Sequence, residues 1–190
     1  MHEPHANDFH ANLRVARFGI VLALLTISFG FGLGGVFGAM EDPLKEGLRA
    51  SALAVRDTVY RGDDAKIQEV LSKSWSYYKR AHLHGGAIGA ASLGMILLAA
   101  ALRRPRARTL SLTSWALGLG SFGYSIFWLL AGRIAPGMGG TGAAKEALAF
   151  LAVPSAGLLL LGTLGVLLLT CVEFFGSTPA QAQDTTRKAA

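Results

Sequence analysis

The amino-acid sequence predicts an all-α integral membrane protein with four transmembrane helices and an extramembrane amphipathic αα-hairpin between helices 1 and 2. Four long apolar stretches occur, at residues 18–40, 82–102, 110–131 and 148–174. Each is close to the ~20 residues that carry a helix across a ~30 Å hydrocarbon core. Hydrophobic residues make up 52% of the chain and charged residues 16%, whereas about 25% charged is usual in soluble domains. The net charge of +6 is therefore interpreted as a signal of membrane topology, and no nucleic-acid partner is expected.

The N-terminal part is predicted to be a polar cytoplasmic tail, residues 1–17, followed by the first transmembrane helix, residues 18–40. The apolar run of this helix exceeds the about 7–15 residues of a signal-peptide core, and no Ala-x-Ala cleavage site follows it. We therefore expect the helix to be retained. Gly30, Gly34 and Gly38 are each four residues apart, which lines them along one helical face and allows another helix to approach closely.

Residues 41–81 are predicted to form an outer helical hairpin. The first apolar stripe recurs at three- and four-residue spacing and comprises Leu44, Leu48, Ala52, Val55 and Val59. Residues 61–64 (Arg-Gly-Asp-Asp) then break the pattern and supply an aspartate suited to cap a second helix. A second stripe extends over residues 67–78. The helix that carries it can continue directly into the second transmembrane helix, residues 82–102.

The link at residues 103–109 predicts the orientation of the chain. It contains four arginines and no acidic residue, and short basic links are retained in the cytoplasm. An even number of crossings places both termini on that same side. We therefore predict a protein of a bacterial inner membrane with both termini cytoplasmic, and with residues 41–81 and 132–147 outside.

The remaining elements follow from the same pattern. Residues 110–131 and 148–174 are predicted as the third and fourth transmembrane helices. The outer Gly-rich loop between them, residues 132–147, lacks the Gly-x-x-x-x-Gly-Lys-[Ser/Thr] spacing of a phosphate-binding loop. Thr141 in that loop is a candidate helix N-cap. Residues 175–190 have the composition of a disordered cytoplasmic tail.

The candidate site lies at the outer end of the second transmembrane helix, where His82 and His84 occur. Ionisable groups at membrane depth are functional candidates, and histidine is the commonest metal ligand. Residues two apart on an α-helix point about 200° apart, so both histidines can bind one ion only if the backbone there is extended. Met40 and Met138 are predicted on the same side of the membrane, and thioether with imidazole ligands suits copper(I).

Haem is the second cofactor hypothesis for this site. A bis-histidine haem requires a second histidine facing the first across the bundle. The other histidines of the chain, His2, His5 and His10, are predicted on the opposite side of the membrane. Haem binding would therefore require a ligand from a second protomer or from another subunit. The ordinary interpretation is that His82 and His84 anchor the end of the helix at the membrane interface.

These observations favour a non-enzymatic structural or accessory subunit of a membrane complex. The sequence contains no Ser/His/Asp set that the topology could assemble, and no paired acids inside a span. The alternative is a metal- or haem-binding protein that uses His82 and His84 in redox chemistry or metal handling. A sensor and a transporter remain weaker alternatives. The expected partners are the lipid bilayer and either other membrane subunits or further copies of this chain.

Overall fold

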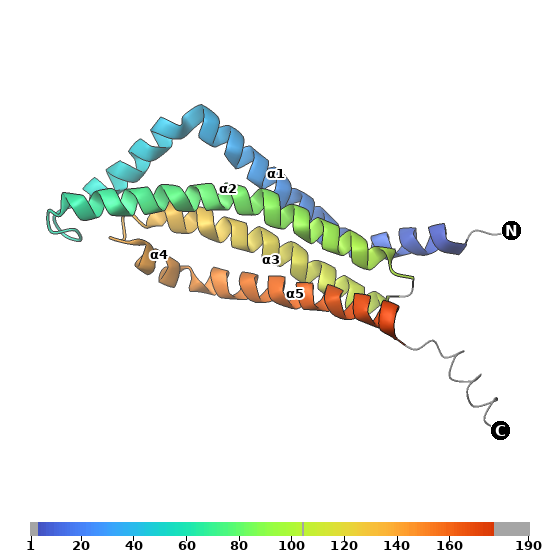
Figure 1. Ribbon diagram of the computed structural model, residues 1–190. Coiled ribbons are helices and arrows are strands. Elements are labelled where there is room, and N and C mark those ends of the chain that lie inside the picture. The colour runs from blue at the N-terminus through green and yellow to red at the C-terminus, as the bar shows by residue number, and fades with distance from the viewer. Residues whose placement is uncertain (1–3, 104, 177–190) are drawn as a thin grey trace, which may run out of the picture.

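The computed structural model describes residues 4–103 and 105–176, and within these ranges it is helical with no strand (Figure 1). The five helices are α1 (Pro4–Leu53), α2 (Asp64–Ala101), α3 (Ala107–Ile134), α4 (Thr141–Ala147) and α5 (Ala149–Phe175). Four of them, α1, α2, α3 and α5, are long and apolar enough to cross a membrane, which confirms the prediction of four long apolar helices. The predicted tail at 175–190 lies almost entirely outside the described residues.

The element boundaries differ from the predicted ones most clearly at the start of α1 and at Thr141. Helix α1 already begins at Pro4, so residues that were predicted as a polar tail extend the first helix. Thr141 is the first residue of α4 rather than its cap, because Gly140 occupies the N-cap position and provides no side-chain hydrogen bond.

The long helices form a three-helix core with a fourth helix at its edge. Helices α1, α2 and α3 all pack on one another, whereas α5 packs mainly on α3. Among the described residues α1 and α5 make no contact, and Figure 1 shows them on opposite sides of the molecule. The arrangement of the four long helices is therefore open: α3 packs on the other three, and one face of α5 is left uncovered.

Glycines bring α1 and α2 into backbone contact. A Cβ added at Gly30 would lie 2.4 Å from the backbone nitrogen of Gly86 and 2.7 Å from the carbonyl carbon of Gly85. Small residues permit such an approach between membrane helices. Gly34 also faces α2, but a Cβ at Gly38 would meet nothing within 4 Å. Each four-residue step advances about 40° around a helix, so Gly38 has turned away from the interface that Gly30 and Gly34 share.

Helix α3 is the most enclosed of the four, with 50% of its most apolar window buried against 11% for α5. Small residues lie at its contacts with α1 and with α5. A Cβ added at Gly19 of α1 would lie 2.3 Å from the backbone oxygen of Ser114, and one added at Gly120 would lie 2.7 Å from the backbone nitrogen of Leu159 in α5. The buried Ser125 hydroxyl donates to the Ser121 carbonyl at 2.9 Å, so it needs no partner on another helix.

A bend divides α1 into two arms. Met40 has non-helical backbone angles (φ −135°, ψ 28°), and Pro43 follows three residues later inside the same helix. Proline lacks the backbone N–H that would bond the carbonyl four residues earlier, and its ring clashes there, which kinks a helix. The arm at residues 41–53 returns toward α2 beyond the bend (Figure 1) and buries Leu48 and Ala52.

The turn between α1 and α2 is held by polar contacts. The Asp63 carboxylate caps α2 by accepting from the Lys66 backbone N–H at 2.9 Å. Arg56 donates two hydrogen bonds to Asp64, at 2.8 and 2.9 Å. The Tyr60 hydroxyl donates to the Pro136 carbonyl at 2.7 Å, and burial raises the pKa of Tyr60. This turn and the segment before α4 therefore close one end of the molecule together.

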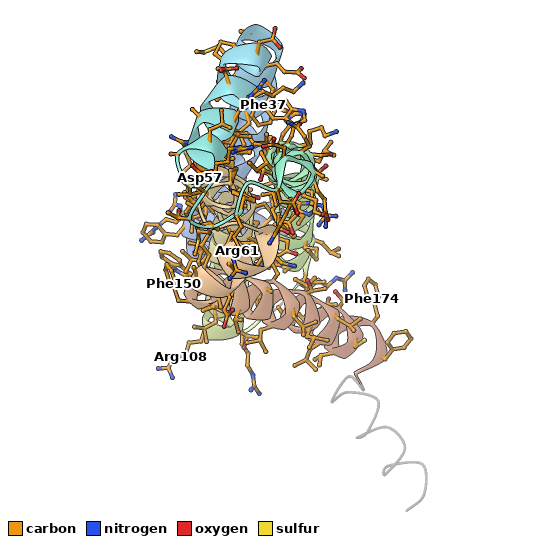
Figure 2. The ribbon with its side chains drawn as sticks, turned by 90° about the vertical axis from the view of Figure 1, so that its left-hand side faces the viewer. Phe37, Asp57, Arg61, Arg108, Phe150 and Phe174 are labelled. Carbon is orange, nitrogen blue, oxygen red and sulfur yellow. The ribbon has the colours of Figure 1, made fainter. Side chains whose placement is uncertain are left out.

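The uncovered face of α5 is apolar along its whole length. Its exposed residues include Phe150, Val153, Leu160, Leu161, Leu164, Leu167, Leu168, Val172 and Phe174. Figure 2 shows Phe150 and Phe174 projecting away from the rest of the molecule. An apolar surface of this extent is typical of a protein that contacts lipid or another protein.

The close approach of α1 and α2 leads to a prediction for two neighbouring glycines. We expect Gly30→Ala to destabilise the fold by about 1–3 kcal/mol, because the added methyl group meets backbone atoms that cannot rotate away. Gly32→Ala is the matched control, since a Cβ there meets nothing within 4 Å. Thermal unfolding in mild detergent measures both. Equal losses of stability in the two variants would contradict the packing described here.

Candidate functional site

His82 of α2 faces α1, where it contacts the helix backbone. Its Nδ1 atom lies 2.7 Å from the Gly30 carbonyl oxygen. A carbonyl oxygen only accepts hydrogen bonds, so Nδ1 carries the hydrogen and donates it. The ring nitrogen that remains for any other role is Nε2. His82 thus joins the two helices at the point where their backbones approach most closely.

Gly34 makes the space that the His82 ring occupies. A Cβ added at Gly34 would lie 2.6 Å from the His82 Cε1 atom. On the other side the Phe37 ring meets the imidazole edge to face, with the ring centroids 6.2 Å apart. Since Gly30, Gly34 and Phe37 are all on α1, this helix provides the acceptor, the space and an aromatic wall for one side chain of α2.

His84 faces α3 instead. Its ring stacks on Tyr124, with the centroids 5.6 Å apart, and meets Trp128 at 6.1 Å. The guanidinium carbon of Arg80 lies 4.9 Å from the Trp128 ring centroid. A further aromatic side chain lies at this level as well, because Tyr77 contacts Trp128 edge to face at 4.8 Å. The environment of His84 is an aromatic cluster between α2 and α3.

The structure does not bring the two histidines together. Helix α2 is unbroken from Asp64 to Ala101, so the extended backbone that a shared ion would require is not formed. Met40 is at the bend of α1 and Met138 follows α3, with side chains 50% and 40% exposed. Within the described ranges no group of three or more His, Cys, Asp and Glu side chains could hold a metal ion. The copper or haem site remains a prediction without geometric support.

A second candidate site is the cleft between the arm of α1 at residues 41–53 and the first half of α2. Its volume is about 600 Å³. The lining residues are Asp42, Lys45, Glu46, Leu48, Arg49, Gln68, Leu71, Ser72, Trp75, Ser76 and Lys79. Leu48, Leu71 and Trp75 supply an apolar surface, whereas the charged residues of both signs surround it. We call this site the outer cleft.

The aromatic contacts below the bend hold the outer cleft open. Phe37, which Figure 2 labels near the bend of α1, lies 5.4 Å from Trp75 and 5.8 Å from Tyr78 between ring centroids. Trp75 and Tyr78 stack on each other at 5.8 Å. The Lys45 ammonium lies 5.1 Å from the Trp75 ring centroid, which shows that this indole face accepts a cation.

Sequence analysis identified the two histidines but not the outer cleft. The apolar stripe through Leu48 is evident in the sequence, and Trp75 lies within the second stripe at residues 67–78. However, a helical stripe predicts only which face is buried, and the stripes on both arms would equally suit a tightly closed hairpin. The cleft depends on the bend at Met40 and on the Phe37 side chain inserted beneath it.

The comparisons with known proteins assign nothing to this chain. No protein-family model, no curated protein and no solved structure matches it. Any functional assignment therefore depends on the residues and their geometry alone.

The contact between Gly34 and His82 generates a double-mutant prediction. We expect Gly34→Ala to destabilise the wild-type protein, because the new methyl group collides with the imidazole. In a His82→Ala background the same substitution should cost little, since the ring is gone. The two changes should therefore be non-additive, with a coupling of about 0.5–3 kcal/mol in thermal unfolding. Additive effects would show that His82 does not occupy this space.

The copper and haem hypotheses are tested on the same purified protein. We expect an absorption spectrum and elemental analysis to be unchanged by His82→Ala/His84→Ala, because both rings pack against neighbouring helices. A haem Soret band or near-stoichiometric copper that the double variant loses would overturn this expectation and establish a metal or redox role.

Proposed function

We propose that this chain is a non-enzymatic accessory subunit of a membrane complex, and that α1, α2, α3 and α5 span a bacterial inner membrane with both termini in the cytoplasm. Four apolar helices support the spanning arrangement. The start of α1 and the end of α5 lie at the same end of the molecule as the link between α2 and α3 (Figure 1). This is the arrangement expected of four crossings.

The proposed orientation is supported by the arginines at that end. Arg14 and Arg17 lie near the start of α1, and Arg103, Arg106 and Arg108 lie in or next to the link between α2 and α3. Lysine and arginine in short segments beside a span are retained in the cytoplasm. The opposite end, which carries the outer cleft, has charges of both signs and would face the outside.

A non-catalytic role is supported by the hydrogen bonds that several buried polar groups make to helix backbones. His82 donates to the α1 backbone. Ser114 donates to the Leu110 carbonyl at 2.7 Å and Ser121 to the Gly118 carbonyl at 3.0 Å. These groups satisfy helix backbones, and none of them is paired with a base or an acid that would activate it for chemistry.

The observation that carries the proposal is the outer cleft. The cleft has a volume of about 600 Å³, and its lining combines an apolar surface with charged residues of both signs. Such a lining suits a protein segment that carries both apolar and charged side chains. The cleft lies directly outside the proposed span, since Lys79 lines it and the span begins at His82. A partner anchored in the same membrane would reach the cleft at high effective concentration. We therefore propose that the outer cleft holds the juxtamembrane segment of another membrane subunit.

A pair of adjacent substitutions on α2 tests the proposal. Ser72 lines the cleft, whereas Lys73 is the next residue, points about 100° away around the helix and pairs with Glu69 on the exposed surface. We expect Ser72→Trp to fill the cleft and reduce recovery of the partner subunit on the order of tenfold, equivalent to the loss of about 1.4 kcal/mol of binding. Lys73→Trp should leave recovery unchanged.

The measurement is quantitative mass spectrometry of complexes purified in mild detergent from native membranes, with a photo-cross-linker at position 72 to identify the contacting subunit. A chain that purifies alone with full solubility would contradict the proposal. Equal recovery of the partner with Ser72→Trp and Lys73→Trp would show that any complex forms without the outer cleft.

A further inference from the structure

A second groove lies toward the opposite end of the molecule, between residues 14–18 of α1 and residues 111–115 of α3. It is lined by Arg14, Val15, Arg17, Phe18, Ser111 and Trp115, and its volume is about 310 Å³. Both helices begin at this end and run in the same direction (Figure 1). We call this site the basic groove. None of its lining residues belongs to the outer cleft or to the surroundings of His82 and His84.

The basic groove carries positive charge without a counter-charge. Arg14 and Arg17 are three residues apart on α1, which places them side by side on one helical face. The ion pairs formed among the described residues involve Lys45, Arg56 and Lys73, and neither arginine of the groove takes part in one. No acidic side chain lines the groove. Two adjacent guanidinium groups without a carboxylate form a site for an anion.

The surface beneath the arginines is aromatic. The Phe18 and Trp115 rings stack with their centroids 5.1 Å apart and an interplanar angle of 26°, and the Arg17 guanidinium carbon lies 4.8 Å from the Phe18 centroid. Both rings remain open to the surroundings, at 47% and 37% exposure. Tryptophan at this level is typical of the headgroup region of a membrane.

The same helical faces continue as apolar surface toward the middle of the molecule. On α1, Phe18 is followed at helical spacing by Val21 and Leu25, and on α3 Trp115 is followed by Leu119, all of them exposed. The surface thus changes along one direction from paired arginines, through an aromatic pair, to aliphatic side chains. A soluble anion would use only the first part of this surface, whereas an amphiphile would use all of it.

We propose that the basic groove binds an anionic phospholipid of the cytoplasmic leaflet. The guanidinium groups of Arg14 and Arg17 and the Ser111 hydroxyl donate to phosphate oxygens, a contact for which arginine geometry is well suited. The first acyl segments lie on Phe18 and Trp115. The inference rests on the membrane placement proposed above, but it adds a defined ligand site to one interface between α1 and α3.

Matched arginine variants distinguish lipid binding in the groove from a general attraction to the basic end of the molecule. Arg14→Gln/Arg17→Gln removes two charges that line the groove. Arg103→Gln/Arg108→Gln removes two charges at the same end that do not line it, and Figure 2 shows Arg108 extending away from the helices. Both variants change the net charge equally, so a nonspecific attraction to anionic membranes would fall equally in both.

The readout is quenching of tryptophan fluorescence by brominated lipids in reconstituted vesicles, using either dibrominated phosphatidylglycerol or dibrominated phosphatidylcholine at the same mole fraction. The difference between the wild type and Trp115→Phe isolates the signal of Trp115. We expect phosphatidylglycerol to quench Trp115 preferentially. The preference should fall on the order of tenfold in Arg14→Gln/Arg17→Gln, since each arginine near an anionic surface adds substantially to lipid attraction, and should persist in Arg103→Gln/Arg108→Gln.

Each other outcome overturns the inference in a distinguishable way. Equal quenching by the two lipids would leave the membrane placement intact and refute the site. Equal loss of preference in the two arginine variants would assign the attraction to the whole basic end. Loss of the preference on adding excess inorganic phosphate would make the groove a site for a free anion. Absence of quenching by either lipid would refute the membrane placement itself.

Discussion

The backbone contact between α1 and α2 at Gly30 is the constraint on which the other interactions depend. In the proposed membrane setting, lipid tails are as apolar as the helix side chains, so helices gain little by simple hydrophobic burial and associate through close packing and interhelical hydrogen bonds. The contact at Gly30 supplies the close packing. By bringing the Gly30 carbonyl to His82, it also supplies an interhelical hydrogen bond. The neighbouring glycine, Gly34, then provides the space for the ring.

The bend of α1 has a different consequence, because it separates the end of the molecule that carries the outer cleft from the rest of the packed long helices. The arm beyond Met40 returns to α2 at Leu48 and Ala52, and the turn that follows is bonded to the segment before α4 through Tyr60 and Pro136. The outer end thus has a small core of its own. The space left beneath the bend becomes the outer cleft, with the Phe37 side chain separating it from the interior of the bundle.

The candidate site could be predicted only in part. The pattern of apolar residues places His82 and His84 on one helix, and helical geometry alone shows that they point in different directions. It does not show what each one meets. Those contacts depend on which residues of α1 and α3 lie beside each histidine. His82 contacts a backbone carbonyl of α1, and His84 contacts an aromatic cluster. The residue types suggested that the two histidines could bind one ligand together. In the structure, however, the two side chains do not lie in the same place.

The sequence by itself determined the four long apolar helices and the break near Asp63, because hydrophobic length and capping are properties of a few consecutive residues. The tertiary structure decided which members of the glycine series pack, that α5 attaches only at the edge, and that clefts form at the two ends. These features depend on the rotation and height of each helix relative to its neighbours. Many side chains on several helices determine that arrangement together, so no short sequence pattern predicts it.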